Sequence, residues 1–125
     1  MTFEADLKSH LQADASIAAL VADRIWPIVR AQGSSLPAIT YQRVAGTPQS
    51  DLDGDDGDLI EVRVQIDCWA RGFEDVRTLA ELVRVRLQTA ASTFRGRLLF
   101  DQDFYEDDVK VFRVSQDFAL WYRST

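Results

Sequence analysis

The sequence has little of the residue types that hold small secreted and metal-bound domains together. It contains one cysteine and one histidine among 125 residues. A single cysteine, Cys68, excludes an intrachain disulfide, and a lone thiol is typical of a protein from a reducing compartment. We therefore interpret Cys68 as a small buried hydrophobic residue and expect the domain to fold on its hydrophobic core alone.

Long apolar runs and an excess of positive charge are also missing. No run approaches the length of a membrane span, and the N-terminus carries Glu4 and Asp6 where a secretory signal has basic residues. The formal net charge is −6, whereas nucleic-acid binders usually carry a basic stripe that displaces counterions from phosphates. We expect neither membrane insertion nor specific nucleic-acid binding.

What is present suits one globular domain spanning residues 1–125, because 46% of the residues are hydrophobic and 27% are charged. Apolar spacing and turn residues predict seven elements. They are helices over about 3–13 and 16–22, strands over 38–44 and 59–70, a helix over about 73–90, and strands over about 97–105 and 110–122. Ser16 is the expected N-cap of the second helix. Gly96, between two arginines, and the acidic residues 106–108 predict turns.

The strand over 59–70 fixes the expected fold class. Apolar side chains occupy every second position from Ile60 to Cys68, and polar side chains occupy the positions between them, from Glu61 to Asp67. One face of the sheet therefore packs on a core while the other meets water or a neighbouring subunit. With mostly short connections, we predict an α+β two-layer sandwich, in which helices cover one face of an antiparallel sheet of about four strands.

Residues 46–58 predict a mobile acidic loop, since they hold almost nothing apolar. The aspartates are Asp51, Asp53, Asp55, Asp56 and Asp58. A calcium loop needs acids at its first, third and fifth positions, which the first three supply. It also needs glycine at the sixth position and glutamate at the twelfth, where this sequence has Asp56 and Val62. A solvated negative loop is the simpler interpretation, and a small metal- or ligand-binding domain is the alternative.

Other chemical patterns are weak. His10 is the only histidine and has Lys8 and Ser9 beside it, so we expect a structural role. Asp108 and Lys110 match part of a magnesium-dependent nuclease pattern, but they lie where two strands turn. We predict no catalytic residue, no metal ligand and no cofactor.

Two tryptophans fall on the outward side of their strands, Trp69 on the strand over 59–70 and Trp121 on the last strand. Arg63 and Arg113 share that side. Tryptophan and arginine are enriched at subunit interfaces. These four residues are the candidate interface, with ordinary sheet packing as the alternative.

The chain as a whole resembles the tail completion, or tail terminator, proteins of long-tailed bacterial viruses. Four segments carry the resemblance: residues 3–29, which end in an Arg-Ile-Trp-Pro-Ile-Val sequence, then 36–48, 64–87 and 112–122. The resemblance implies a structural protein without enzyme activity or cofactor, located in the virion at the head-proximal end of the tail and assembled in the bacterial cytoplasm. It implies a homo-oligomeric ring, commonly of six copies, that caps the tail tube and joins it to the head connector.

A ring needs two different contact faces on each subunit. The outward sheet face and the outer side of the helices are the expected pair. A channel that passes DNA favours neutral or negative walls, because basic walls would retain phosphate. We therefore expect the segment Asp51–Asp58 to line or rim the channel.

Overall fold

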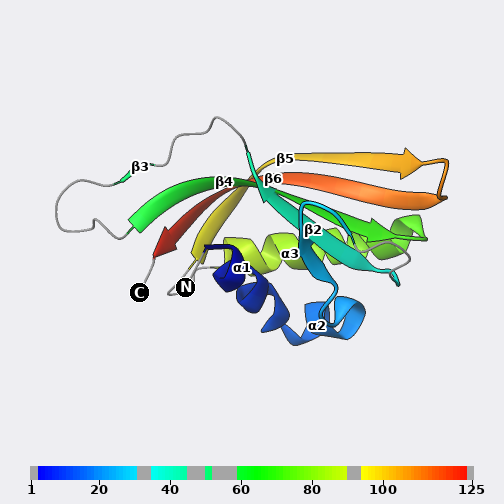
Figure 1. Cartoon of the computed structure of the whole chain (residues 1–125), viewed down its shortest axis with the longest axis horizontal. Helices are drawn as coiled ribbons and strands as arrows, with labels where there is room; N and C mark the ends of the chain where they lie inside the picture. The colour runs from blue at the N-terminus through cyan, green and yellow to red at the C-terminus, as the bar shows by residue number, and fades with distance from the viewer. Residues whose placement is uncertain (1–2, 31–34, 45–49, 52–58, 90–93, 124–125) are drawn as a thin grey trace.

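The computed structural model describes residues 3–30, 35–44, 50–51, 59–89 and 94–123. Along the chain (Figure 1) the elements are α1 (Phe3–Gln12), α2 (Ala15–Val21), β1 (Ile25–Pro27), β2 (Ala38–Arg43), β3 (Ser50–Asp51), β4 (Leu59–Ala70), α3 (Phe73–Gln88), β5 (Phe94–Glu106) and β6 (Val111–Arg123). None of these helices is both long enough and apolar enough to cross a membrane. The expected mobile loop at 46–58 lies outside the described residues, apart from the two residues of β3.

One sheet contains all the strands, in the order β1-β2-β4-β6-β5, and the two-residue β3 pairs with β4 beside that path. The expected number of about four strands was therefore too low: five strands form the path. The expected antiparallel pairing holds except at β1, which runs parallel to β2. Three residues around a proline carry no alternation of their own, which is why β1 was not predicted. The final strand, β6, lies between β4 and β5.

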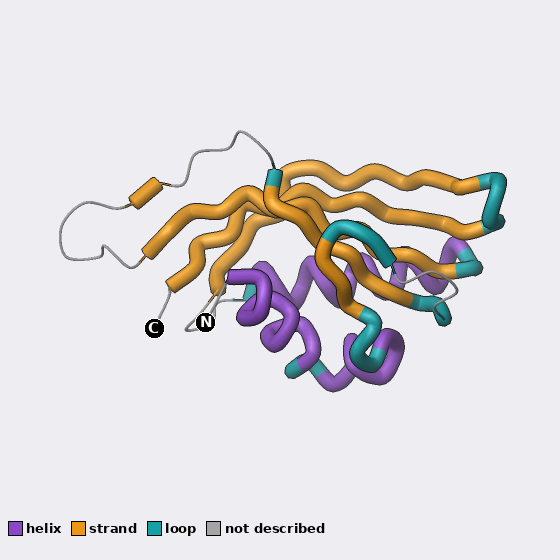
Figure 2. The backbone as a smooth tube through the Cα atoms, viewed as in Figure 1, coloured by secondary structure: helices purple, strands orange, loops and turns teal. Residues whose placement is uncertain are grey.

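The three helices cover the same face of this sheet (Figures 1 and 2), which confirms the predicted α+β architecture. Inward side chains of β4, among them Val64 and Ile66, are fully buried together with Leu79 and Val83 of α3. α1 contributes Phe3 to the same core, where its ring centroid lies 5.2 Å from that of Tyr122. The core therefore sits between the helices and the inward side of the sheet, and the outward side has no second layer of described structure.

Asp14, and not Ser16, is the N-cap of α2. Its Oδ1 accepts hydrogen bonds from the backbone N–H groups of Ser16, at 2.9 Å, and Ile17, at 3.2 Å. Both residues are good caps by type, but helix α2 begins at Ala15. The residue just before the first helical one is the one whose side chain can reach those free N–H groups.

The predicted turn at Gly96 was wrong, because this glycine lies inside β5 and pairs with Leu120 of β6. A Cβ at position 96 would lie 2.4 Å from Leu120 Cδ2 and 3.0 Å from the carbonyl oxygen of Leu87. The missing side chain thus lets the end of α3 approach the strand closely. That approach places Gln88 Oε1 3.0 Å from the backbone N–H of Leu98, from which it accepts a hydrogen bond.

A polar chain runs between α3 and the sheet. Gln116, which interrupts the apolar side of β6, is buried, and its Nε2 donates to the carbonyl oxygen of Ala80 at 3.1 Å and to Asp101 at 3.3 Å. Arg77 of α3 pairs with the other oxygen of Asp101 at 2.9 Å. Because buried polar groups are stable only with partners, this chain fixes α3 in one position over β5 and β6.

Replacing Gly96 by alanine should lower the free energy of unfolding by about 1–3 kcal/mol, because the added methyl group overpacks the contact between α3 and β6. The measurement is urea unfolding. Gly72→Ala is the matched control, since its Cβ would meet only the flexible Asp75 carboxylate, at 3.2 Å. Equal effects of the two substitutions would contradict this account of the α3 contact.

Candidate functional site

The outward side of the sheet is called here the outer face. On β4 it consists of Glu61, Arg63, Gln65, Asp67 and Trp69, and on β6 their partners are Trp121, Ala119, Asp117, Ser115 and Arg113. The predicted alternation is confirmed on β4, because its inward side chains are buried from Val62 to Cys68 and its outward ones, from Glu61 to Trp69, are only half-buried. All four predicted interface residues therefore lie on one face, but they occupy two separate places on it.

Trp69 and Arg113 are direct partners across β4 and β6. The Trp69 indole Nε1 donates a hydrogen bond to Thr40 Oγ1 of β2 at 3.1 Å. Arg113 stacks over the ring of Phe104, with Cζ 4.1 Å from its centroid, and lies 5.4 Å from the centroid of the Trp69 ring. Arg30 lies over the same Trp69 ring at 5.1 Å. Both predicted residues are therefore already engaged within the subunit.

Ion pairs complete this cluster. Arg113 lies 3.4 Å from Asp67 and 3.5 Å from Glu106, and the Arg113 and Asp67 side chains are only 19% and 14% exposed. Burying charges this far from solvent is costly unless each has a partner of opposite charge. The cluster links β2, β4, β6 and β5 across the outer face and therefore stabilises the sheet.

Trp121 and Arg63 lie toward the other end of the outer face. Trp121 is 37% exposed and pairs with Glu61 on one side and Arg95 on the other. The β6 partner of Trp69 is Arg113, eight positions before Trp121, so the two tryptophans lie about 26 Å apart along the strands. The Arg63 Nε is buried and has no hydrogen-bond partner among the described residues. Among the described residues, this end of the face has one unsatisfied buried group, and the Trp69 end has none.

A groove of about 500 Å³ opens at this end. Its lining is Glu61, Gln88, Arg95, Gly96, Arg97, Ala119 and Trp121. Arg95 and Arg97 pair with Trp121 and Ala119 respectively, so both project from β5 onto the outer face. Neither arginine has an ion pair or hydrogen bond with another described residue. The groove therefore combines two available cations with an exposed aromatic side chain.

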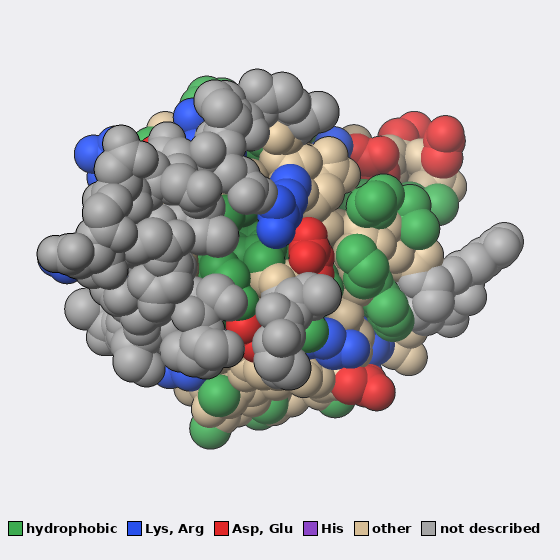
Figure 3. Space-filling view, turned by 60° about the vertical axis from the view of Figure 1, so that its left-hand side comes forward, with side chains coloured by type: hydrophobic (Ala, Val, Ile, Leu, Met, Phe, Trp, Pro, Cys, Tyr) green, Lys and Arg blue, Asp and Glu red, His purple; other side chains and the backbone are tan. Residues whose placement is uncertain are grey.

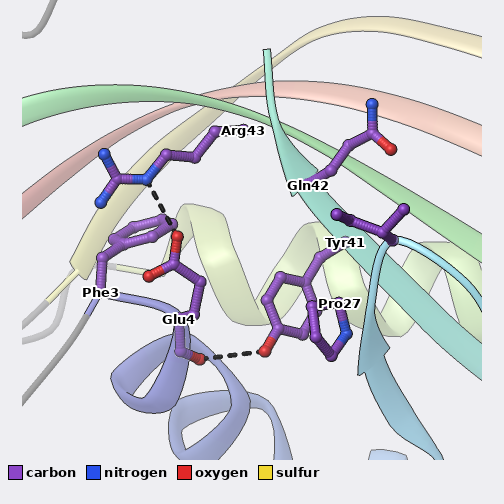
Figure 4. Close-up of a pocket in the computed structure, with 7 residues that line it drawn as sticks. Phe3, Glu4, Pro27, Tyr41, Gln42 and Arg43 are labelled. Atoms are coloured by element: carbon purple, nitrogen blue, oxygen red, sulfur yellow. Dashed lines mark hydrogen bonds and ion pairs between the residues drawn. The ribbon is translucent and has the colours of Figure 1, made fainter. Parts of the chain in front are cut away.

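A second hollow, of about 440 Å³, lies where the start of α1 meets β1 and β2 (Figure 4). Glu4 closes it on one side through an ion pair with Arg43 at 3.1 Å, and its carbonyl oxygen accepts a hydrogen bond from the Tyr41 hydroxyl at 3.4 Å. Burial first, and the Glu4 charge second, raise the pKa of Tyr41. The Tyr41 hydroxyl therefore stays protonated and acts as a hydrogen-bond donor.

Ile28, which lines this hollow, and its neighbour Val29 are the most exposed large hydrophobic side chains among the described residues, at 67% and 70%. Ile28 has a φ of 69°, a left-handed conformation that strains a β-branched residue. Its N–H donates to the carbonyl oxygen of Tyr41 at 2.9 Å, which holds the turn. Ile28 and Val29 were not predicted as exposed residues, because two aliphatic residues after a proline form no helical or strand periodicity. Their position as an apolar pair next to a loop was the one feature of the sequence that could have indicated them.

Exposed hydrophobic side chains occur elsewhere as well. The others are Phe73, Val85, Leu99, Phe100, Tyr105, Val109 and Trp121. Figure 3 shows hydrophobic patches lying between acidic and basic side chains on one side of the molecule. Several such patches on a small domain are typical of a protein that contacts partners through more than one surface.

The remaining candidates do not gather into a site. Cys68 is fully buried, as predicted, and burial raises the pKa of its thiol. Asp108 and Lys110 lie in the exposed turn between β5 and β6. Of the five aspartates in the acidic segment, Asp51 belongs to β3 and the other four lie outside the described residues. Within the described ranges no three His, Cys, Asp or Glu side chains are grouped to hold a metal ion.

His10 lies near the end of α1 and is half-buried. Its ring centroid lies 5.1 Å from that of Phe94, and its carbonyl oxygen accepts a hydrogen bond from Arg86 Nε at 2.9 Å. Burial, and then the nearby Arg86 charge, lower the pKa of His10 below 6.5. The ring packs against Phe94, and the structural role expected for His10 remains a prediction.

A family model described as "Tail completion protein gp17" matches residues 5–123. The chain belongs to this family. Among curated proteins no sequence matches. This tail completion protein also resembles a protein chain in a solved virion structure. A chain from the virion of a native gene transfer agent (GTA) particle superposes with a TM-score of 0.65 at 19% identity, over 98% of this chain and 95% of that one. That likeness establishes a common fold.

Substituting Arg113 by alanine should lower the free energy of unfolding by about 1–3 kcal/mol, because Asp67 is left without its cation in a poorly solvated position. Chemical unfolding measures the change. The control is Arg84→Ala, which breaks a solvent-exposed ion pair with Glu81 and should cost clearly less. An Arg113 variant as stable as the wild type would show that the outer-face cluster holds nothing together.

His10 should make stability depend on pH. Since its pKa is lowered in the folded state, the unfolded chain binds the proton first as pH falls below 6.5. The wild type should therefore lose stability relative to His10→Gln as pH falls from 6.5 to 5, by no more than about 1.4 kcal/mol per pH unit. Well above pH 6.5, where neither state binds the proton, the difference should be constant. Urea unfolding at a series of pH values measures it, and a difference that grows above pH 7 instead would contradict this burial effect.

Proposed function

We propose that this protein is a structural component of a tailed, phage-like virion that caps the tail tube and joins it to the head connector as a homo-oligomeric ring, with six copies as the expected number. Membership of the tail completion family is the observation that carries the proposal. The fold shared with a chain of a gene transfer agent virion supports it. In this proposal the partners are other copies, the tail tube protein and the connector, and no reaction is catalysed.

The distribution of surfaces supports a ring. A ring repeats one head-to-tail contact, so each copy must present two different surfaces that face in different directions. The turn bearing Ile28 and Val29 follows β1, at one edge of the sheet, while Arg95, Arg97 and Phe100 lie on β5 at the opposite edge. We propose that these two edges belong to the two sides of the repeated contact. The helical side, which was the other expected contact face, is then free for the tube or the connector.

The four predicted interface residues receive different tasks in this proposal. Trp121 and Arg63, at the end of the outer face with one unsatisfied buried group, contact the neighbouring copy. Trp69 and Arg113 hold the sheet in the shape that makes this contact possible, since their polar groups already have partners within the subunit. This division follows from the local geometry, because aromatic side chains in partly open pockets are the usual energetic centres of an interface.

The acidic segment Asp51–Asp58 keeps its proposed place at the rim of the channel. β3 pairs with the first residues of β4, so the segment begins and ends at the same end of the sheet. A negative rim would repel DNA phosphates and prevent them from binding there. The segment would then serve passage of DNA, with no need for a bound metal ion.

Electron microscopy of the purified protein mixed with tail tubes tests the proposal. Rings should appear at one end of the tubes. Trp121→Ala should weaken capping by at least about tenfold, as expected when an interface aromatic is truncated. Tyr105→Ala removes an aromatic of similar exposure from the other end of β5 and is the control. Tubes that remain uncapped at all protein concentrations would contradict the proposal.

A further inference from the structure

An aromatic patch lies where α3 begins near the turn between β5 and β6, at one end of the sheet (Figure 1). Tyr105 of β5 pairs with Phe112 of β6, and their ring centroids lie 4.8 Å apart. The ring of Phe73, the first residue of α3, lies 5.8 Å from that of Phe112. Phe112 is half-buried, whereas Phe73 and Tyr105 are 47% and 49% exposed. These three residues, called here the aromatic patch, therefore leave two rings open to a partner.

Acidic residues flank the aromatic patch in the sequence. Residues 71–75 and 105–110 hold two basic residues, Arg71 and Lys110, and five acidic ones, which are Glu74, Asp75, Glu106, Asp107 and Asp108. Glu106 is paired with Arg113, but the other four acidic residues make no ion pair with a described residue. The start of a helix carries about half a unit of positive charge, which the two carboxylates in the first turn of α3 outweigh. The patch therefore lies in negative surroundings that attract a cation.

Two other places in the chain show what an aromatic ring beside a carboxylate binds. Arg113 Cζ lies 4.1 Å from the ring centroid of Phe104, and the same guanidinium pairs with two carboxylates. Arg43 Cζ lies 5.1 Å from the ring centroid of Phe3, and its Nε lies 3.1 Å from the carboxylate of Glu4. A guanidinium can do both because it stacks on a ring through its flat face and donates hydrogen bonds along its edge.

The aromatic patch has the rings and the carboxylates but lacks the arginine. Among the described residues no arginine or lysine lies over Phe73, Tyr105 or Phe112. A second copy is a poor source of that cation, because the chain has a net charge of −6 and two acidic surfaces repel each other. The unpaired arginines on β5, Arg95 and Arg97, already belong to the contact proposed for the ring. A different protein is the better source.

We propose that the aromatic patch binds an arginine-bearing segment of a partner protein, with the guanidinium stacked on the open rings and paired with the carboxylates beside them. The inference goes beyond the proposed function, in which Tyr105 lies outside the capping surface, so the partner is neither this chain nor the tail tube protein. Arginine suits the patch better than lysine, because an ammonium group is more strongly hydrated and has no flat face to stack.

A peptide titration of the full chain, followed by nuclear magnetic resonance, tests the inference. The probe is the acetylated and amidated peptide Gly-Arg-Leu-Arg-Gly, and the backbone amide signals of residues 71–75 and 105–112 should shift most. The same peptide with lysine in place of arginine should bind at least about threefold more weakly, and the glutamine version should not bind. An arginine peptide that leaves these signals in place, or shifts other segments more, overturns the inference.

Substitutions in the aromatic patch provide the second arm of the test. Phe73→Ala with Tyr105→Ala should weaken binding of the arginine peptide at least about tenfold. Phe100→Ala is the matched control, since Phe100 is 56% exposed elsewhere on β5, and it should bind the peptide like the wild type. Asp107→Asn with Asp108→Asn changes only the exposed turn and should also weaken binding, most at low salt. Wild-type affinity in either double variant, or an equal loss in the control, overturns the inference.

This inference and the proposed function can fail separately. Capped tubes with no binding of the arginine peptide would remove the inference and leave the tail function in place. Peptide binding by a protein that never caps tubes would do the reverse. The variant carrying Phe73→Ala and Tyr105→Ala should still cap tubes and associate with itself like the wild type. Loss of capping or of self-association in that variant would make the tube protein or a second copy the partner, and would overturn the inference.

Discussion

The pairing of β4 with β6 is the interaction on which the rest of the structure depends. Twelve residue pairs, from Leu59 with Arg123 to Ala70 with Phe112, join these two strands in one uninterrupted register. A shift of one residue would exchange the buried and outward sides of both strands. The same register therefore creates the core beneath the helices and brings Trp69 beside Arg113 and Trp121 beside Glu61 on the outer face. The outer face and the core are two consequences of one alignment.

Much of the fold was predictable because β4 and α3 carry strong periods. The alternation from Ile60 to Cys68 gave both the strand and its buried side, and the spacing from Phe73 to Leu87 gave the long helix. Features that depend on contacts distant in sequence were not predictable. The parallel strand β1 exists only because Ile25–Pro27 meets β2. Gly96 lies in a strand because α3 comes close to it, and a glycine between two arginines looks the same in a turn.

The candidate site was predictable in part for the same reason. Alternation places Trp69, Trp121, Arg63 and Arg113 on the outer face, but it does not say which of them already have partners. That depends on Thr40 and Asp67, which are far in sequence from their partners Trp69 and Arg113 and are aligned only by the sheet, and on Glu106, which meets Arg113 across the β5–β6 turn. Ile28 and Val29 gave no periodic signal at all, although they are the most exposed large hydrophobic residues described. An exposed apolar pair outside a regular helix or strand leaves no period that the sequence could show.

The central claim is that this chain's surfaces serve assembly of a tail and its attachment to a head. The most direct measurement is the length and head attachment of tails made by the particle's own genes after deletion of this one, counted by electron microscopy. The account predicts tails of irregular length without heads, restored to normal by supplying the intact gene. Tails of normal length joined to heads in the absence of the protein would contradict it.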